Sequence, residues 1–180
     1  MTKNDAENQT ALMPSVRDSL ARHGIRHKVL PCSDEFSDTA AFCEHYNVSL
    51  DQAANTIVVT SRKVEPSRQA VCVVLGTTRL DVNKTVRELL GVKRASFADA
   101  ELTVAVTGMV IGGVTPFGTA RMAIYVDSAV LEQSEVIMGG GNRTSKLRLD
   151  PRELVKLPGV QVIVGLANPS ATPPVPVASP

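Results

Sequence analysis

Aromatic residues are scarce in this chain. Its 180 residues include no tryptophan, two tyrosines and four phenylalanines, although 43% of the residues are hydrophobic. The core must therefore be built mainly from valine, leucine, isoleucine and alanine. No basic stretch is interleaved with aromatic residues, so the sequence does not predict generic single-strand binding by base stacking.

The chain also lacks an excess of charge of one sign. Nineteen lysine and arginine residues stand against eighteen acidic ones, which gives a net charge of +1. A protein that wraps a long phosphate backbone needs many cationic contacts, so this balance argues against that class. A small local basic patch is still compatible with this net charge.

Long apolar runs and paired cysteines are absent as well. No apolar run approaches the length of a membrane span. Three cysteines, an odd number, form no C-x-x-C pair, and the N-terminus resembles no signal peptide, which together predict a cytoplasmic protein whose cysteines pack as small hydrophobic residues. His23 and His27 have metal-like spacing only on a single helix, and Gly24 breaks that helix, so we expect no metal centre.

The two ends of the chain differ from its middle. The opening residues are polar, and residues 168–180 hold five of the eleven prolines. We predict a disordered arm over residues 1–13, one folded domain over residues 14–166 and a disordered, proline-rich tail over residues 167–180.

Between these ends, short helical and strand patterns follow one another. Helices are predicted over 14–24, 37–48, 80–91 and 149–157, the last with an Asp150 cap and a capping box completed by Glu153. Strands are predicted over 25–30, 55–62, 69–76, 121–130, 134–140, 146–150 and 159–166, and the turn at 63–67 indicates a hairpin. Strands outnumber helices, so the expected class is α+β with a mixed, largely antiparallel sheet.

Residues 108–118, GMVIGGVTPFG, are unusual because four glycines and a proline lie between apolar runs. Gly113 and Gly118 have the spacing of a phosphate loop, but the two following residues are not the lysine and serine or threonine that such a loop requires. Two interpretations stay open. The stretch is either a tight corner stiffened by Pro116, or a small pocket wall formed by backbone groups around Gly112 and Gly113.

A longer pattern surrounds this stretch. It combines Thr107–Gly108, the block from Gly112 to Gly118, Asp127 at the end of the next strand, and the glycine-rich turn GGGNRTSKLRL before the last helix. With this pattern, residues 14–166 resemble the YbaK and prolyl-tRNA synthetase-associated domain family. The resemblance implies a barrel-like sheet flanked by helices, and hydrolysis of the ester that joins a wrong amino acid to tRNA, with no metal or organic cofactor. The implied partner is the acceptor end of an aminoacyl-tRNA, with an aminoacyl-tRNA synthetase as a possible further partner.

The resemblance also implies roles for individual residues. Gly112 and Gly113 would position the substrate carbonyl or a water molecule, and Asp127 would hold the α-amino group or organise the loop. Other residues implied to contact substrate are Thr107, Thr115 and Pro116, and those implied to steer the tRNA are Arg143 and Lys146.

The same residues have simpler interpretations from their local patterns alone. A carboxylate at a strand end, such as Asp127, is more typical of a turn or a helix cap. Thr107 is more typical of a strand residue with a hydrogen-bonded hydroxyl. The basic run that includes Arg143 and Lys146 is commonly a solvated face.

One position departs from the family. Members with deacylase activity typically carry a lysine in a K-T-hydrophobic-hydrophobic pattern at the start of the strand after the second helix, where this chain has Asn55-Thr56-Ile57-Val58. Asparagine can hydrogen-bond a carbonyl or a ribose hydroxyl but supplies no charge. Lys63 lies at the far end of the same strand and is a poor substitute.

Three functions therefore stay open. The first is a trans-editing deacylase that acts on a small mischarged amino acid and uses Asn55 as a polar pocket group. The second is a non-catalytic module of the same fold that binds tRNA, an aminoacyl derivative or a protein partner. The third is hydrolysis of an unrelated activated ester or amide. Neither the amino acid nor the oligomeric state follows from the sequence.

Overall fold

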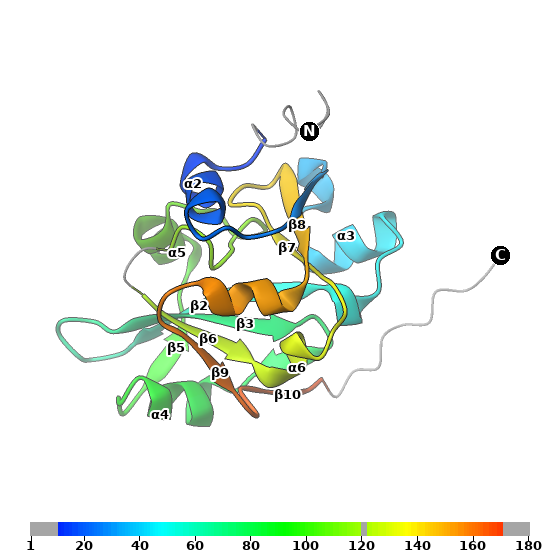
Figure 1. Cartoon of the computed structure of the whole chain (residues 1–180). Helices are drawn as coiled ribbons and strands as arrows, with labels where there is room; N and C mark the ends of the chain where they lie inside the picture. Colours follow the sequence, from blue (N-terminus) through cyan, green and yellow to red (C-terminus); the bar gives the residue numbers. More distant parts are fainter. Residues whose placement is uncertain (1–10, 120–121, 171–180) are drawn as a thin grey trace.

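The computed structural model describes residues 11–119 and 122–170 of the chain (Figure 1). Its strands are β1 (Lys28–Pro31), β2 (Ala54–Ser61), β3 (Gln69–Leu75), β4 (Thr78–Leu80), β5 (Ala95–Phe97), β6 (Ala123–Asp127), β7 (Val136–Gly139), β8 (Ser145–Leu149), β9 (Val160–Ile163) and β10 (Ala167–Pro169). Its α-helices are α2 (Pro14–Arg22), α3 (Thr39–His45), α4 (Arg87–Leu89), α5 (Ala100–Thr107) and α6 (Ser128–Leu131). Shorter turns are the 3-10 helices η1 (Asp34–Phe36), η2 (Leu50–Gln52) and η4 (Pro151–Lys156), and the π-helical turn η3 (Val82–Val86).

The strands form three sheets. The largest has the order β5–β2–β3–β6–β9, the second has the order β1–β8–β7, and the third pairs β10 with β4. Parallel pairing joins β3 to β6 and β6 to β9, and the remaining ladders are antiparallel. The predicted α+β class and mixed, largely antiparallel pairing are confirmed. The barrel-like expectation is corrected, because the sheets of the described part are open.

The five-stranded sheet separates two hydrophobic clusters. Alternate side chains of a strand point to opposite faces, and on β3 Val71 and Val73 join one cluster whereas Cys72 and Val74 join the other. The first cluster lies between the five-stranded sheet and the layer formed by α2 and the three-stranded sheet. The second cluster lies on the opposite face, between the five-stranded sheet and the turns η3 and α4 (Figure 1). Burial on both faces explains why β3 is a continuous apolar run in the sequence.

Several predicted elements are confirmed with short shifts of their ends. The hairpin of β2 and β3 is antiparallel, with Asn55 opposite Val74. The segment predicted as a helix over 80–91 contains η3 and α4, and Asp81 caps it by accepting a hydrogen bond from the Lys84 N–H at 3.1 Å.

Both domain boundaries move outward. Leu12 is 2% exposed and packs in the first cluster, and the Met13 N–H donates to the Gly140 carbonyl at 3.3 Å, so residues 11–13 belong to the packed domain rather than to an arm. At the other end, β10 extends the domain to Pro169. The rest of the predicted arm and tail, residues 1–10 and 171–180, lies outside the described residues.

Two local predictions were wrong. Thr107 ends a helix, α5, and not a strand; Asp99 caps this helix and Gly108 ends it at a φ of +72°. Glu153 does not complete a capping box, since its buried carboxylate accepts hydrogen bonds from the Arg26 N–H at 3.0 Å and the Arg26 Nε at 2.9 Å. Long-range pairing with Arg26 therefore takes the place of the local cap.

Within the described ranges, 11–119 and 122–170, no helix is both long enough and apolar enough to cross a membrane. The three cysteines are free and buried, and burial raises the pKa of each thiol, to about 12 for Cys72. This agrees with their predicted role as small hydrophobic residues.

Candidate functional site

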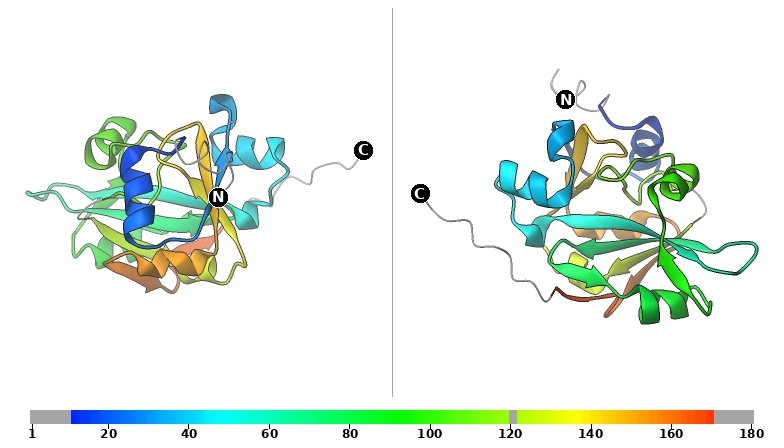
Figure 2. Two further views of the ribbon diagram at one scale, coloured as in Figure 1. Left: turned by 45° about the horizontal axis from the view of Figure 1, so that its top comes forward. Right: turned by 180° about the vertical axis from the view of Figure 1, so that it is seen from behind.

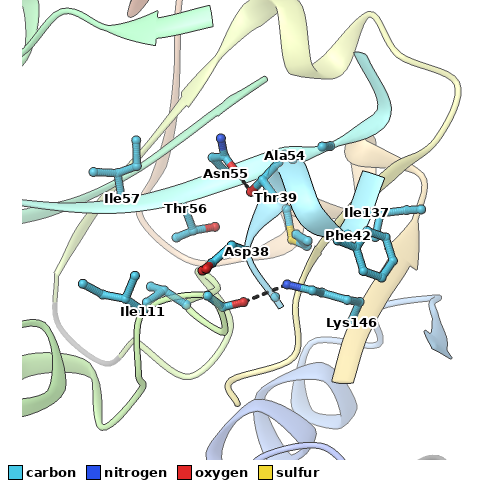
Figure 3. A pocket seen from close by; sticks show the side chains of 15 residues that line it. Asp38, Thr39, Phe42, Ala54, Asn55, Thr56, Ile57, Ile111, Ile137 and Lys146 are labelled. Carbon is cyan, nitrogen blue, oxygen red and sulfur yellow. Dashed lines mark hydrogen bonds between the residues drawn. The ribbon is translucent and has the colours of Figure 1, made fainter. Parts of the chain in front are cut away.

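A cavity of about 200 Å³ lies where the two larger sheets meet (Figure 3). Its walls come from the first residues of β2, the start of α3, the loop after α5, and strands β7 and β8. Apolar side chains from Phe42, Ile57, Ile111 and Ile137 line it together with a few polar groups. The volume is below the roughly 300–1,000 Å³ of pockets for drug-sized ligands, so the cavity suits only a small ligand group.

The glycine stretch forms one wall of this cavity, and close backbone packing explains its composition. The Gly141 N–H donates to the Gly113 carbonyl at 2.8 Å. A Cβ built on Gly113 would lie 2.5 Å from the carbonyl carbon of Asn142, and one on Gly139 would lie 2.5 Å from the Val114 oxygen. Neither site can hold a side chain without moving backbone, so these glycines let the 108–118 loop lie directly on the β7–β8 turn.

Gly112 has a different environment from Gly113. It lines the cavity with a φ of +90°, in the left-handed region that favours glycine. Its carbonyl oxygen accepts a hydrogen bond from the Lys146 Nζ at 2.7 Å (Figure 3). The structure thus contains both features that the sequence left as alternatives: a tight corner at Gly113 and a cavity wall at Gly112.

Lys146 is a residue of the cavity and does not lie on an exposed face. Its side chain is 6% exposed, and its ammonium donates to the carbonyl oxygens of Gly112 and Ser37. An ammonium has three N–H donors; the Lys146 Nζ also lies 5.5 Å from the centroid of the Phe42 ring, and no oxygen of the described residues accepts from the third N–H. Burial lowers the pKa of Lys146, and nearby Arg143 acts in the same direction. The predicted role in steering tRNA is therefore corrected, because a buried ammonium cannot reach a phosphate outside the cavity.

Asn55, at the position of the family lysine, is engaged with α3. Its Oδ1 accepts a hydrogen bond from the Thr39 hydroxyl. The next side chain, Thr56, points to the other side of β2, toward Asp38 and Lys146 (Figure 3). The Thr56 hydroxyl and that of Ser37 are both buried, with no hydrogen-bond partner among the described residues.

Asp38 and Arg143 lie at the rim. The Arg143 guanidinium pairs with Asp34 and, at 3.5 Å, with Asp38, and it donates to the Ile111 carbonyl at 3.2 Å. The hydrogen bond to Asp34 is the main cause that raises the pKa of Arg143. Arg143 thus ties η1 and the glycine loop together, and two carboxylates offset the charge that was expected to steer tRNA.

The start of α3 is held in place by ring packing. Phe36 stacks on His45 with 3.7 Å between ring centroids, and Phe42 packs on Tyr46 at 4.6 Å. This cluster fixes the helix that carries Thr39 and follows Asp38.

Four other predicted site residues lie outside the cavity lining. Asp127 is 5% exposed, and its oxygens accept from the Ala129 N–H at 2.9 Å and the Ala167 N–H at 2.8 Å, so it caps α6 and anchors β10. The Thr107 hydroxyl donates to the Thr103 carbonyl at 2.6 Å. Thr115 is fully buried against Met138, and Pro116 lines a different hollow beside α2.

The cavity thus brings together Gly112, Asn55 and Lys146 from the predicted set and adds Asp38, Thr39, Phe42 and Thr56. From the sequence, Asp38 and Thr39 were recognised only as the start of a helix, and Thr56 only as the threonine of the K-T-like pattern, so none of them was predicted as a site residue. Their convergence depends on contacts between segments far apart in the chain.

Comparison with known proteins shows the family of this chain. Residues 34–157 match the aminoacyl-tRNA editing domain family. The chain belongs to that family. The match spans the whole cavity, from Asp38 to Lys146, and confirms the resemblance drawn from the glycine block.

Individual relatives are similar over most of their length. The uncharacterized protein YwhH of Bacillus subtilis (strain 168) is 31% identical over 120 residues, which cover 62% of this chain and 75% of YwhH. The crystal structure of the hypothetical protein APE2540 has a TM-score of 0.73 at 28% identity and covers 82% of this chain and 96% of that one. A crystal structure described as "a putative trans-editing enzyme for prolyl tRNA synthetase" has a TM-score of 0.71 at 28% identity, covering 85% and 97%.

Proposed function

We propose that this protein is an aminoacyl-tRNA deacylase that acts in trans on tRNA mischarged with a small amino acid. The observation that carries the proposal is the buried ammonium of Lys146, held by two carbonyls inside a cavity of about 200 Å³ and left with one N–H for a ligand. Membership of the editing family supports the substrate class.

The reaction would be hydrolysis of the ester between the amino acid and the terminal ribose. A water oxygen attacks the ester carbonyl, the bond to the ribose oxygen breaks, and that oxygen leaves with a proton. Negative charge develops on the carbonyl oxygen during the attack. A preorganised cation in a poorly solvated site stabilises such charge strongly, and the third N–H of Lys146 would supply that stabilisation.

Other cavity residues have complementary roles in this proposal. The α-ammonium of the amino acid would bind the Asp38 carboxylate at the rim, and the unpartnered Thr56 hydroxyl would hydrogen-bond the substrate or the attacking water. Gly112 orients Lys146 through its carbonyl oxygen. Asn55 would contribute as a polar group at the mouth, and Lys146, from a different strand, would supply the charge that Asn55 lacks.

The test is deacylation of tRNAs mischarged with alanine, serine, cysteine or threonine. Wild type is compared with Lys146→Met, with Lys146→Gln, and with Lys28→Met as a control at an exposed lysine of the same three-stranded sheet. We expect wild type and Lys28→Met to clear at least one substrate, and both Lys146 variants to lose about 10²–10³-fold in kcat. Circular dichroism and thermal unfolding of each variant show whether it is folded.

A non-catalytic binding module is the second candidate, and the asparagine at position 55 is the observation that favours it. That candidate gains support if folded wild type binds the acceptor end but clears none of the four substrates. Gain of activity in Asn55→Lys would then indicate an editing site whose chemistry has lapsed.

A further inference from the structure

Nearly a third of the basic residues gather at one end of the five-stranded sheet, where the β2–β3 hairpin turns. They line two adjoining surface hollows of about 420 and 410 Å³, which share Arg62, Lys93 and Arg94. We call this set the basic corner; its members are Arg62, Lys63, Arg68, Arg87, Lys93 and Arg94. Six of nineteen cations thus stand together in a chain whose net charge is only +1.

Hydrogen bonds to neutral groups hold the basic corner in place. The Arg62 N–H donates to the Arg94 carbonyl at 2.9 Å, which joins the residue after β2 to the residue before β5. The Arg62 Nε donates to the Ser96 hydroxyl at 2.8 Å, and the Arg68 Nη1 donates to the Leu90 carbonyl at 2.9 Å. These contacts orient the guanidinium groups without neutralising their charge.

Acidic side chains offset little of this charge. Arg87 pairs with Glu88 at 3.4 Å. None of the other five cations has a carboxylate within 4.0 Å in the part of the chain that the structure describes. Guanidinium and ammonium groups that are positioned and uncompensated are suited to phosphate oxygens.

The basic corner and the cavity lie at the two ends of β2. Asn55 lines the cavity and Arg62 follows the last residue of the strand, so seven residues of extended chain, roughly 23 Å, separate them. The hairpin end and α3, which borders the cavity, lie at opposite ends of the sheet (Figures 1 and 2). This separation equals about seven steps of a stacked nucleic-acid strand at 3.4 Å each, enough to cover the unpaired 3′ end of a tRNA and reach its first base pairs.

We infer that the basic corner binds phosphates of the acceptor stem while the aminoacyl end of the same tRNA occupies the cavity. The inference rests on the proposed function for its ligand. It explains how a chain of nearly zero net charge can engage tRNA, since a few cations at the correct distance suffice for a short contact. Phosphate contacts of this kind position the ligand and carry no sequence information.

The first experiment measures binding of uncharged tRNA, and so needs no catalysis. Wild type is compared with the double variant Arg62→Gln/Arg94→Gln and with a matched control, Arg22→Gln/Lys28→Gln, which removes two exposed cations elsewhere. We expect the double variant to bind tRNA at least tenfold more weakly at 100 mM salt. The slope of log Kd against log salt should also fall by about 1.4–1.8, and the control should match wild type. Equal binding by the double variant and wild type would overturn the inference.

Poly-glutamate serves as a polyanion without nucleic-acid geometry. Wild type should bind tRNA at least tenfold more tightly than poly-glutamate of equal charge; equal affinity would overturn the inference in favour of an acidic protein partner.

A second experiment compares hydrolysis of full-length mischarged tRNA with that of an aminoacylated CCA trinucleotide, which lacks the stem. The double variant should lose at least tenfold in kcat/KM on the tRNA, through KM, and nothing on the trinucleotide. Equal losses on both substrates would overturn the inference. If wild type hydrolyses neither substrate while the double variant still loses tRNA binding, the proposed deacylase function is wrong, but the basic corner is confirmed as a tRNA-binding surface.

Discussion

The ammonium of Lys146 lies 2.7 Å from the carbonyl oxygen of Gly112. This contact joins β8 to the glycine stretch that lines the cavity. It relates the two unusual features of the sequence, which are the glycine stretch itself and the asparagine at the position of the family lysine. The glycine lets the backbone turn its carbonyl toward the cavity, and in the proposed function the lysine would supply the charge that Asn55, at the family position on β2, lacks. In that proposal a residue from one sheet serves a site that the sequence pattern places on another.

The pH dependence of deacylation should report the titration of Lys146. Burial lowers the pKa of this group below its ordinary 10.5, and the proposed mechanism needs the protonated form. We therefore expect kcat/KM, after subtraction of the uncatalysed alkaline hydrolysis, to fall as pH rises through that lowered pKa. In Lys146→Arg the part of the fall due to position 146 should disappear, because the guanidinium does not titrate in the accessible range, and only the part due to deprotonation of the substrate's α-ammonium should remain. A wild-type profile that stays flat up to pH 10.5 would rule out the ammonium as the active form.

Gly112 and Gly113 should respond differently to alanine. A Cβ on Gly113 would overlap the Asn142 backbone, so we expect Gly113→Ala to cost about 3 kcal/mol of unfolding free energy. In Gly112→Ala the Cβ would lie 2.8 Å from a flexible Arg143 nitrogen, and the cost should be nearer 1–2 kcal/mol, with a clear loss of activity. Gly24→Ala is the control, since its φ is +58° but nothing lies within 4 Å. Urea unfolding of the three variants gives the order, and equal losses at Gly24 and Gly113 would contradict the backbone contact.

Much of the fold could be predicted because its signals are local. The β2–β3 hairpin corresponds to two β-branched runs that flank a polar turn in the sequence, and α2 begins with Pro14 and ends before Gly24. Helix α5 is not visible in the sequence because two threonines and two valines make up half of its eight residues, and these residues favour strands. Strands of three residues, such as β4 and β10, carry too short a pattern to be seen.

The candidate site was harder to predict because its contacts are long-range. Lys146 lies in a basic run that is typical of a solvated face, and only its carbonyl partners, 109 and 34 residues away, make it a cavity residue. Asp127 shows the opposite case. Its pattern was compatible with a helix cap, and the structure places it as one, whereas the resemblance to the family had suggested a ligand.

Thr56→Val should separate activity from stability. The Thr56 hydroxyl is buried without a partner among the described residues, and an unpaired buried hydroxyl costs about 1–3 kcal/mol. Removing it should leave the unfolding free energy unchanged or raise it, while deacylation falls by at least tenfold. Thr107→Val is the matched control, since its hydroxyl donates to the Thr103 carbonyl at 2.6 Å and accepts from the buried Met109 N–H at 2.9 Å; we expect it to lose about 1–3 kcal/mol and keep its activity. A Thr56→Val protein with wild-type kinetics would remove this hydroxyl from the mechanism.

Stability in acid should depend on Glu153. Burial of this carboxylate acts to raise its pKa, but hydrogen bonds from Lys156 and Arg26 outweigh burial and hold the pKa at about 2, below the ordinary 4.5. Because the folded state releases this proton more readily than the unfolded state, the pair stabilises the fold above pH 5, and that contribution is lost as pH falls toward 2. We expect Glu153→Gln to lower the unfolding free energy by on the order of 2 kcal/mol at pH 7 and by much less at pH 2. Glu35→Gln, at an exposed carboxylate, is the control and should follow wild type across the range. A loss in Glu153→Gln that is as large at pH 2 as at pH 7 would mean that packing, and not the charge of the carboxylate, holds η4 against Arg26.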